Sequence, residues 1–239
     1  TTFRIWPEEF TLAVFQKMWE RPSQSLPFIG ILKNSLLVSG GAALLSVWLG
    51  ASMAYAFARF RFPGRKTGLF ALLVGALLPP VALMTPLFIL LSILQIRTTL
   101  FGLMVVYTAF AMPFCIWNMR SAFQSVSKEL EESAFLDGAT PLVAFGLVTL
   151  PLALPSIAIA GLIAFLIGYS EFAMGWLFVD KSDNVTLAMA ISGMLQSGYL
   201  ESWANLAALA IMMSLPVVVL FLLLQRTLID RLLIGKVES

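Results

Sequence analysis

The sequence predicts an all-α, polytopic membrane protein. Hydrophobic residues make up 59% of its 239 residues, and the mean hydropathy is +0.92. Charged residues make up 12%, about half the share usual in soluble domains. Several uncharged intervals exceed the roughly 20 residues that a helix needs to cross a bilayer. Together these observations exclude an ordinary soluble globular domain.

Five apolar segments are long enough to cross the membrane, namely residues 34–58, 68–94, 98–119, 148–170 and 203–225. The second contains Pro79, Pro80 and Pro86, so we expect a kinked or broken helix there. Such a break serves either packing or a substrate path. The segments leave an N-terminal arm at residues 1–27, a polar loop at 171–202 and a C-terminal tail at 226–239. Within the loop, residues 187–195 are a candidate surface helix.

Small residues recur at every fourth position in two of the apolar segments. They are Ser46, Gly50, Ala54 and Ala58 in the first, and Ala160, Ala164 and Gly168 in the fourth. Small residues at this spacing allow helices to approach closely. The stripes therefore fill a bundle or form a seam with a second chain.

The distribution of basic residues predicts the orientation in the membrane. The turn at 59–66, the segment at 120–140 and the C-terminus lie on one side of a five-span chain. Their basic residues are Arg59, Arg61, Arg65, Lys66, Arg120, Lys128, Arg226, Arg231 and Lys236. The opposite loops between spans hold only Arg97 and Lys181. By the positive-inside rule, the first side is cytoplasmic, whereas the arm and the 171–202 loop are extracytoplasmic.

The segment from 127 to 141, which we call the elbow, predicts two helices joined by a sharp turn. Ser127 is a candidate N-cap, and acidic residues follow it near the positive end of the helix. Gly138 can take the left-handed conformation that ends a helix. Thr140 and Pro141 suit the N-cap and first position of the next helix. We expect the carboxylates at 129–132 to form a solvated or partner-facing surface.

The sequence lacks the residues that catalysis or metal binding would need. It has no histidine and a single Cys115, and no phosphate-binding loop, nucleophile motif or zinc motif. We therefore predict no catalytic residue, no metal and no enzyme activity. The net charge of +2 gives no indication of nucleic-acid binding. The predicted spans contain no ionisable group, which argues against an ion-coupled carrier, so the energy must come from a partner.

Two stretches resemble a known family. Residues Glu132–Ala139, with Phe145 and the Leu150–Pro155 run, resemble the EAA motif of importer-type ABC transporter permeases. Residues Tyr55–Gly64 resemble a turn of the maltose-type carbohydrate-uptake permeases, closest to the smaller permease subunit. The resemblance implies a type I ABC importer permease core with a cytoplasmic coupling helix. Such permeases usually have six spans, and the first is missing here, which fits a truncated start.

The resemblance also implies functional residues. In the family, the elbow seats in a groove of a cytoplasmic ATPase, which would be contacted here by Leu130, Glu132, Ser133, Ala134, Phe135, Asp137, Gly138 and Ala139. The tail, with Lys236 and Glu238, either reaches the ATPase or is a disordered terminus. A binding protein would contact Tyr199, Glu201 and Trp203, although Trp203 also suits a membrane-interface anchor.

Two further features have both a structural and a functional interpretation. Glu171, Pro79 and Pro80 are candidates for a gate or the substrate path. For Glu171 the alternative is a carboxylate at a helix end, and for the prolines it is a packing kink. The aromatic residues Trp48, Tyr107 and Trp117 either line the path or pack in the bundle.

The predicted function is that of a permease subunit in a bacterial or archaeal inner membrane. The resemblance implies a second permease, two ATPase subunits that bind the ATP, surrounding lipid, and an extracytoplasmic binding protein that delivers a sugar or oligosaccharide. No cofactor is expected on this chain itself. The alternatives are a permease for phosphate, amino acids or polyamines, a secondary carrier or channel, and a membrane scaffold or enzyme.

Overall fold

The computed structural model describes residues 11–22, 26–196 and 203–234, and in these ranges all regular structure is helical. The all-α prediction is therefore confirmed. The elements are α1 (Ala13–Glu20), α2 (Phe28–Arg59), α3 (Arg65–Leu77), α4 (Pro80–Ile93), α5 (Leu100–Ser125), α6 (Lys128–Leu136), α7 (Pro141–Ala144), the π-helix η1 (Phe145–Thr149), α8 (Leu150–Leu152), α9 (Leu154–Ser170), α10 (Ala173–Phe178), the 3-10 helix η2 (Ser182–Asn184), α11 (Leu187–Gln196) and α12 (Trp203–Ile234).

Three helices of the described part are long and apolar enough to cross a membrane. They are α2, α5 and the Trp203–Gln225 part of α12. Helix α2 begins at Phe28, six residues before the expected span, and so includes Lys33. The amide of Asn34 donates to the carbonyls of Asp183 and Val185 at 2.7 and 3.0 Å. This buried polar side chain thus finds its partners in the segment around η2, 149 and 151 residues further along the chain.

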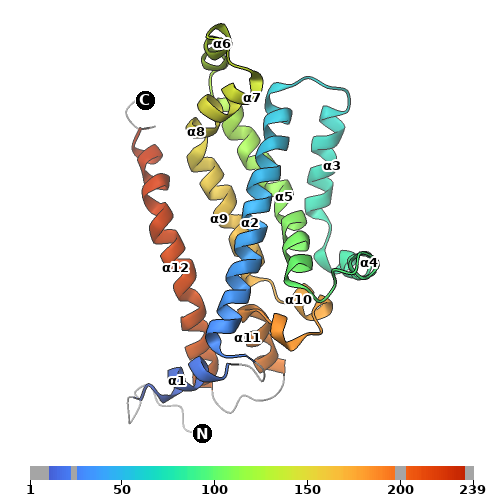
Figure 1. Ribbon diagram of the computed structural model, residues 1–239, viewed down its shortest axis with the longest axis vertical. Coiled ribbons are helices and arrows are strands. Elements are labelled where there is room, and N and C mark those ends of the chain that lie inside the picture. Colours follow the sequence, from blue (N-terminus) through green and yellow to red (C-terminus); the bar gives the residue numbers. More distant parts are fainter. Residues whose placement is uncertain (1–10, 23–25, 197–202, 235–239) are drawn as a thin grey trace.

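The second predicted span is a bent pair of helices. Helices α3 and α4 meet at 101°, and Figure 1 shows α4 end-on beside the upright α3. Leu78 and Pro79 are extended between them, with ψ of 131° and 130°. Pro79 and Pro80 lack the N–H groups that would continue the helical hydrogen bonds. The alternative of a broken helix is therefore the one observed.

The fourth predicted span, residues 148–170, is also not one straight helix. The segment Pro141–Leu152 meets α9 at 79°. The break follows Pro151 and falls at Ala153, whose φ of −93° and ψ of 1° depart from helical values. Upstream, η1 is wound as a π-helix, which nothing in the sequence predicted. If each bent pair counts as one span, the described part of the chain has up to five segments long and apolar enough to cross a membrane.

The core lies where α2, α5 and α9 pack together. Both small-residue stripes are buried there, with Ser46, Ala54, Ala160 and Ala164 at 0% exposure. Small side chains bring the backbones close, as the spacing predicted. The stripes therefore serve packing within this chain and do not form an exposed seam.

The helix expected at 187–195 within the 171–202 loop is present, but its expected place on the surface is wrong. Residues 173–178 and 187–196 form α10 and α11. Leu187 and Met189 of α11 are fully buried against the bundle. The Leu187 N–H donates to Ser35 Oγ at 2.7 Å, and Trp176 Nε1 donates to the Met189 carbonyl at 3.2 Å. The apolar side of α11 thus packs inward.

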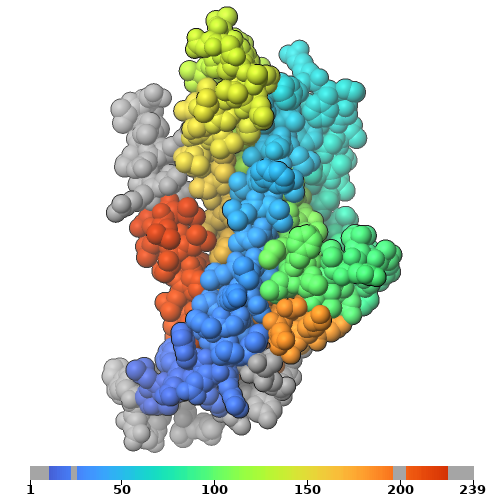
Figure 2. All heavy atoms as spheres, viewed as in Figure 1, coloured from blue at the N-terminus to red at the C-terminus, as the bar shows by residue number. Residues whose placement is uncertain are grey.

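Both ends of the molecule collect segments that are far apart in sequence. Figure 1 shows α6, the α2–α3 turn and the C-terminal end of α12 at one end. Helices α1, α10 and α11 lie at the other. In the space-filling view of Figure 2, α6 projects beyond the helices at its end. The three segments that the charge distribution assigned to one side of the membrane therefore share one end of the structure.

Candidate functional site

The elbow has the helix caps that the sequence predicted. Ser127 Oγ accepts from the Glu129 N–H at 3.2 Å, so α6 begins where expected. Gly138 has a φ of +90°. Beyond it, Thr140 Oγ1 accepts from the Val143 N–H at 3.4 Å, and Pro141 opens α7. Helix α6 has nine residues and is about 13 Å long.

The elbow presents an exposed surface that is both apolar and acidic. Leu130, Phe135 and Leu136 are 48%, 42% and 90% exposed. The other candidate residues Glu132, Ser133, Asp137 and Gly138 are also exposed, whereas Ala134 and Ala139 are half-buried. Exposed leucines on the spans can face lipid, but α6 projects past the spans (Figure 2). Such a surface suits an apolar protein groove with basic residues at its edge.

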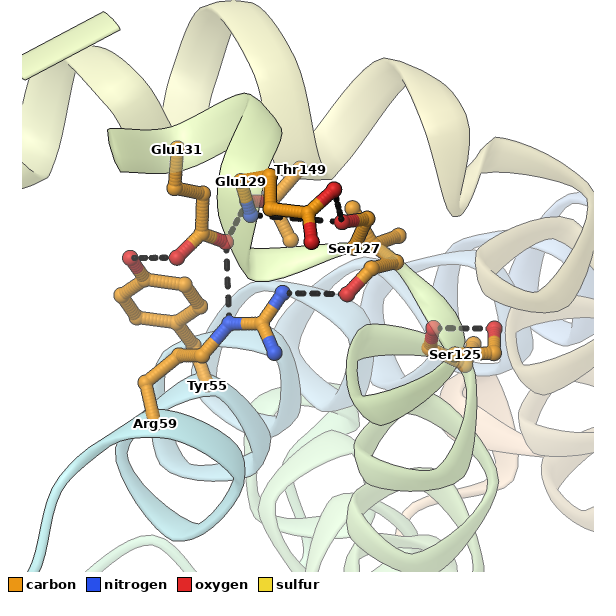
Figure 3. A network of polar contacts seen from close by, with 9 residues as sticks. Tyr55, Arg59, Ser125, Ser127, Glu129, Glu131 and Thr149 are labelled. Atoms are coloured by element: carbon orange, nitrogen blue, oxygen red, sulfur yellow. Dashed lines mark hydrogen bonds and ion pairs between the residues drawn. The ribbon is translucent and has the colours of Figure 1, made fainter. Parts of the chain in front are cut away.

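Glu131 departs from the predicted solvated surface. Its exposure is 5%, and its carboxylate accepts from Arg59 Nε at 3.0 Å, from Thr149 Oγ1, and from the Tyr55 hydroxyl at 3.5 Å. Arg59 also donates to the Val126 carbonyl at 2.9 Å. Figure 3 shows these side chains converging. We call Tyr55, Arg59, Val126, Glu131 and Thr149 the Glu131 network.

The Glu131 network was not predicted from the sequence, because Arg59 is 72 residues from Glu131. Glu129, Glu131 and Glu132 look alike in sequence, yet only the middle one is buried. One local signal was present. It is the apolar Ala134, which comes three residues after Glu131 and therefore lies on the same helix face. In the structure Ala134 is half-buried on the side of α6 that meets the bundle.

Aromatic rings pack beneath the network. The ring of Tyr55 lies 4.4 Å from that of Phe145 and 6.1 Å from that of Phe123, measured between centroids. Phe123 and Phe145 are 5.7 Å apart in an edge-to-face arrangement. The rings come from α2, α5 and η1, so they fix the ends of these elements against one another.

Glu171 is held by hydrogen bonds at the opposite end of the molecule. Its carboxylate accepts from the Tyr107 hydroxyl at 2.9 Å and from the N–H groups of Met174 and Gly175 at 3.0 and 3.4 Å. Glu171 thus caps the start of α10. These contacts match the structural interpretation of Glu171 as a carboxylate at a helix end. A gate role for Glu171, and a substrate-path role for the exposed Pro79 and Pro80, stay predictions.

The remaining candidates lie in different surroundings. Tyr107 is fully buried, so it packs in the bundle, whereas Trp48 and Trp117 are 69% and 38% exposed. Trp203 is 73% exposed at the start of α12. Four candidates lie outside the described residues, namely Tyr199, Glu201, Lys236 and Glu238. Within the described residues, no group of three or more His, Cys, Asp or Glu side chains could hold a metal ion.

Two solved structures share this fold. A bacterial ABC transporter that imports the acidic polysaccharide alginate matches with a TM-score of 0.78 at 20% identity, covering 94% of this chain and 83% of the other. An inward-facing structure of the MetNI methionine ABC transporter matches with a TM-score of 0.63 at 19% identity, covering 87% and 99%. These likenesses show the fold.

Two proteins found by sequence are more similar in sequence to this chain than these two solved structures are. The maltose/maltodextrin transport system permease protein MalG of Escherichia coli strain K12 is 35% identical over 219 residues, covering 89% of this chain and 73% of MalG. The trehalose transport system permease protein SugB of Mycobacterium tuberculosis is 32% identical over 213 residues, covering 89% and 78%. The model of the binding-protein-dependent transport system inner membrane component family matches residues 46–234. This match covers most of the chain, including every element from the middle of α2 onward, and the chain therefore belongs to that family.

Proposed function

We propose that this multi-pass membrane protein forms half of the translocation path of an ATP-driven sugar importer. A second permease forms the other half, and an extracytoplasmic binding protein delivers the solute. Two ATPase subunits bind and hydrolyse the ATP. One observation carries the proposal: α6 is capped, projects past the apolar bundle and exposes Leu130, Phe135 and Leu136 beside two carboxylates.

The proposed orientation places the elbow and the C-terminus in the cytoplasm. It is supported by the α2–α3 turn, α6 and the end of α12, which lie together in Figure 1 and carry most of the basic residues between spans. An elbow on this side can meet a cytoplasmic ATPase. Closure of an ATPase dimer would then displace α6 and the helices attached to it.

A sugar is the proposed solute class because MalG and SugB, at 35% and 32% identity, are named for maltose and maltodextrin and for trehalose. The fold alone does not select the solute, since it is shared with both an alginate and a methionine transporter. The test is ATP-dependent uptake by the complete importer reconstituted in vesicles. We expect accumulation of a labelled maltodextrin or trehalose and none of methionine. The reverse preference would refute the sugar assignment.

A valine at Gly138 tests the role of the elbow. A β-branched residue at a φ of +90° is strained, although no atom lies within 4 Å of the place that its Cβ would occupy. We expect Gly138→Val to reorient α6 while the protein still inserts in the membrane. Solute uptake should then fall at least about tenfold, which is a typical size for the effect of coupling between two sites. Uptake and the amount of assembled complex are measured in the same vesicles.

Gly64 provides a matched control. It has a φ of +83°, its Cβ position is also free of neighbours, and it lies outside the elbow in the α2–α3 turn. Gly64→Val therefore imposes similar backbone strain without moving α6, and we expect it to retain transport. Normal uptake by Gly138→Val, or equal losses in both variants, would contradict the coupling role of the elbow.

A further inference from the structure

One charged side chain of α6, that of Glu131, is buried against the bundle. Most residues of α6 are exposed, yet Glu131 is 5% exposed. Among the side chains that the structure describes, Glu131 is the one buried acidic residue. A carboxylate is costly to bury without partners, so its surroundings must compensate for the loss of water.

The partners of Glu131 come from separate elements. Arg59 is the last residue of α2, and Thr149 is the last residue of η1. The Arg59 guanidinium bonds Glu131 through Nε and the Val126 carbonyl, at the end of α5, through a second nitrogen. One guanidinium thus joins α6 to the ends of both α2 and α5 (Figure 3).

This connection is shielded from water. The side chains of Arg59 and Glu131 are each 7% exposed. Removing one partner of such a pair leaves an uncompensated buried charge, whereas replacing both by apolar residues is often tolerated. The Tyr55, Phe123 and Phe145 rings pack below and limit sideways movement of the three helix ends.

The covalent route from α6 to α9 is poorly suited to transmit a displacement. It passes through Gly138, then the π-helix η1, and then the 79° bend. Each of these interrupts the regular hydrogen bonding that makes a helix stiff. The Glu131 network bypasses all three and reaches α2 directly.

We infer that Glu131 and Arg59 are positioning residues that transmit displacement of α6 to α2 and α5. The elbow and the ends of these two spans then move as one rigid body. The inference rests on the proposed function, since it assumes that an ATPase displaces α6. It adds the route by which that movement enters the permease.

A double substitution separates this role from a structural one. The single variants Arg59→Met and Glu131→Met each leave an unpaired buried charge, so we expect less assembled complex. The double variant Arg59→Met/Glu131→Met removes both charges and recovers assembly. We expect it to hydrolyse ATP yet to move about tenfold less solute per ATP, within the roughly 5- to 150-fold range common for coupling between sites.

If the assembled double variant moves as much solute per ATP as the wild type, the inference is overturned. If the double variant fails to assemble, Arg59→Lys decides. Lysine keeps the charge, but its ammonium cannot reproduce the guanidinium fork toward Glu131 and Val126. A reduced amount of solute per ATP in Arg59→Lys supports the inference, and an unchanged ratio overturns it.

Glu129→Gln is the matched control. It neutralises a carboxylate on the same helix two residues away, but Glu129 is exposed. We expect the wild-type ratio of solute to ATP in this variant. An equal loss in Glu129→Gln would assign the effect to the charge of α6 and overturn the role of the buried pair.

A distance measurement gives an independent readout. Spin labels on Lys128→Cys in α6 and Arg61→Cys beyond α2 occupy exposed positions, and the native Cys115 is fully buried. We expect their separation to be the same without nucleotide and with trapped ATP, and to broaden in the double variant. A separation that changes with ATP in the wild type would contradict rigid-body movement.

The two proposals fail differently. If the wild-type importer shows no ATP-dependent uptake, the proposed function fails. If the wild type transports solute and the double variant matches it per ATP, only the role of the Glu131 network fails.

Discussion

Neighbouring carboxylates have opposite surroundings in this protein. Glu131 and Glu132 are adjacent on α6, but the helix turns by about 100° per residue, so one side chain faces the bundle and the other faces outward. The first can bind Arg59 of its own chain, and the second is free to meet a partner. At the residue scale, orientation on the helix decides between an internal and an external role.

Glu171 gives a prediction at the same scale. Glu171→Ala removes the acceptor for the Tyr107 hydroxyl and for two N–H groups of α10. We expect the free energy of unfolding to fall by about 1–3 kcal/mol, because the buried Tyr107 donor loses its partner. Thermal unfolding of the purified protein measures this loss, and Glu171→Gln should recover part of it.

Asp183→Ala serves as the control, because Asp183 is an exposed carboxylate at the same end of the molecule. We expect a change within about 0.5 kcal/mol for it. If Glu171→Ala keeps the wild-type melting temperature but loses transport, capping is not its main role and the gate interpretation gains support.

At the scale of elements, tight turns and helix breaks give the bundle its shape. The α4–α5 turn places two non-glycine residues, Gln95 and Thr98, at positive φ. Thr98 accepts from the N–H groups of Asp180 and Lys181, each at 3.2 Å, and its own N–H donates to the Phe178 carbonyl. These bonds hold the turn against the segment after α10 and offset the unfavourable backbone conformation.

Gly102 provides a prediction for this turn. The Thr99 hydroxyl caps α5 by accepting from the Gly102 N–H at 3.0 Å. A Cβ at residue 102 would overlap the carbonyl oxygen of Ile96, which is backbone and cannot rotate away. We expect Gly102→Ala to lower the free energy of unfolding by about 1–3 kcal/mol.

The control is Gly75→Ala in α3, where nothing lies within 4 Å of the added methyl group. Alanine is the better helix former, so this variant should be as stable as the wild type or slightly more stable. Comparable melting temperatures for both variants would show that the turn at Ile96 relaxes without cost.

At the scale of the whole molecule, the ends carry the polar contacts and the middle carries the apolar ones. The Glu131 network lies at one end, and the Glu171 contacts and the Arg97–Asp180 ion pair lie with the other group of segments. Small buried residues join α2, α5 and α9 between them. This distribution suits a membrane, in which buried and lipid-facing spans avoid charge.

The proposed orientation is tested by single cysteines. Lys66 and Lys181 are both exposed, on segments that Figure 1 places at opposite ends, and Cys115 is buried and should stay unreactive. We expect a membrane-impermeant thiol reagent to label Lys181→Cys in intact cells, and Lys66→Cys only after permeabilisation. Labelling in the reverse order would place the elbow outside and refute coupling to a cytoplasmic ATPase.

The sequence by itself determined the local features. Long uncharged segments predicted membrane-crossing helices, because apolar length decides this directly. Ser127, Gly138 and Thr140 predicted the caps of the elbow, and Pro79–Pro80 predicted a kink or a break in the helix. These features depend on hydrogen bonds within a few residues along the chain, so the residue types suffice to predict them.

The tertiary structure alone decided which polar residues are buried and which segments pack inward. Arg59 and Glu131 are far apart in sequence, and the burial of Leu187 and Met189 depends on α11 lying against the bundle. Burial and ion pairing are set by which helices become neighbours in space. Residue type does not specify that neighbour, so Glu131 looked like Glu129 and Glu132 until the ends of α2, α5 and η1 were brought around it.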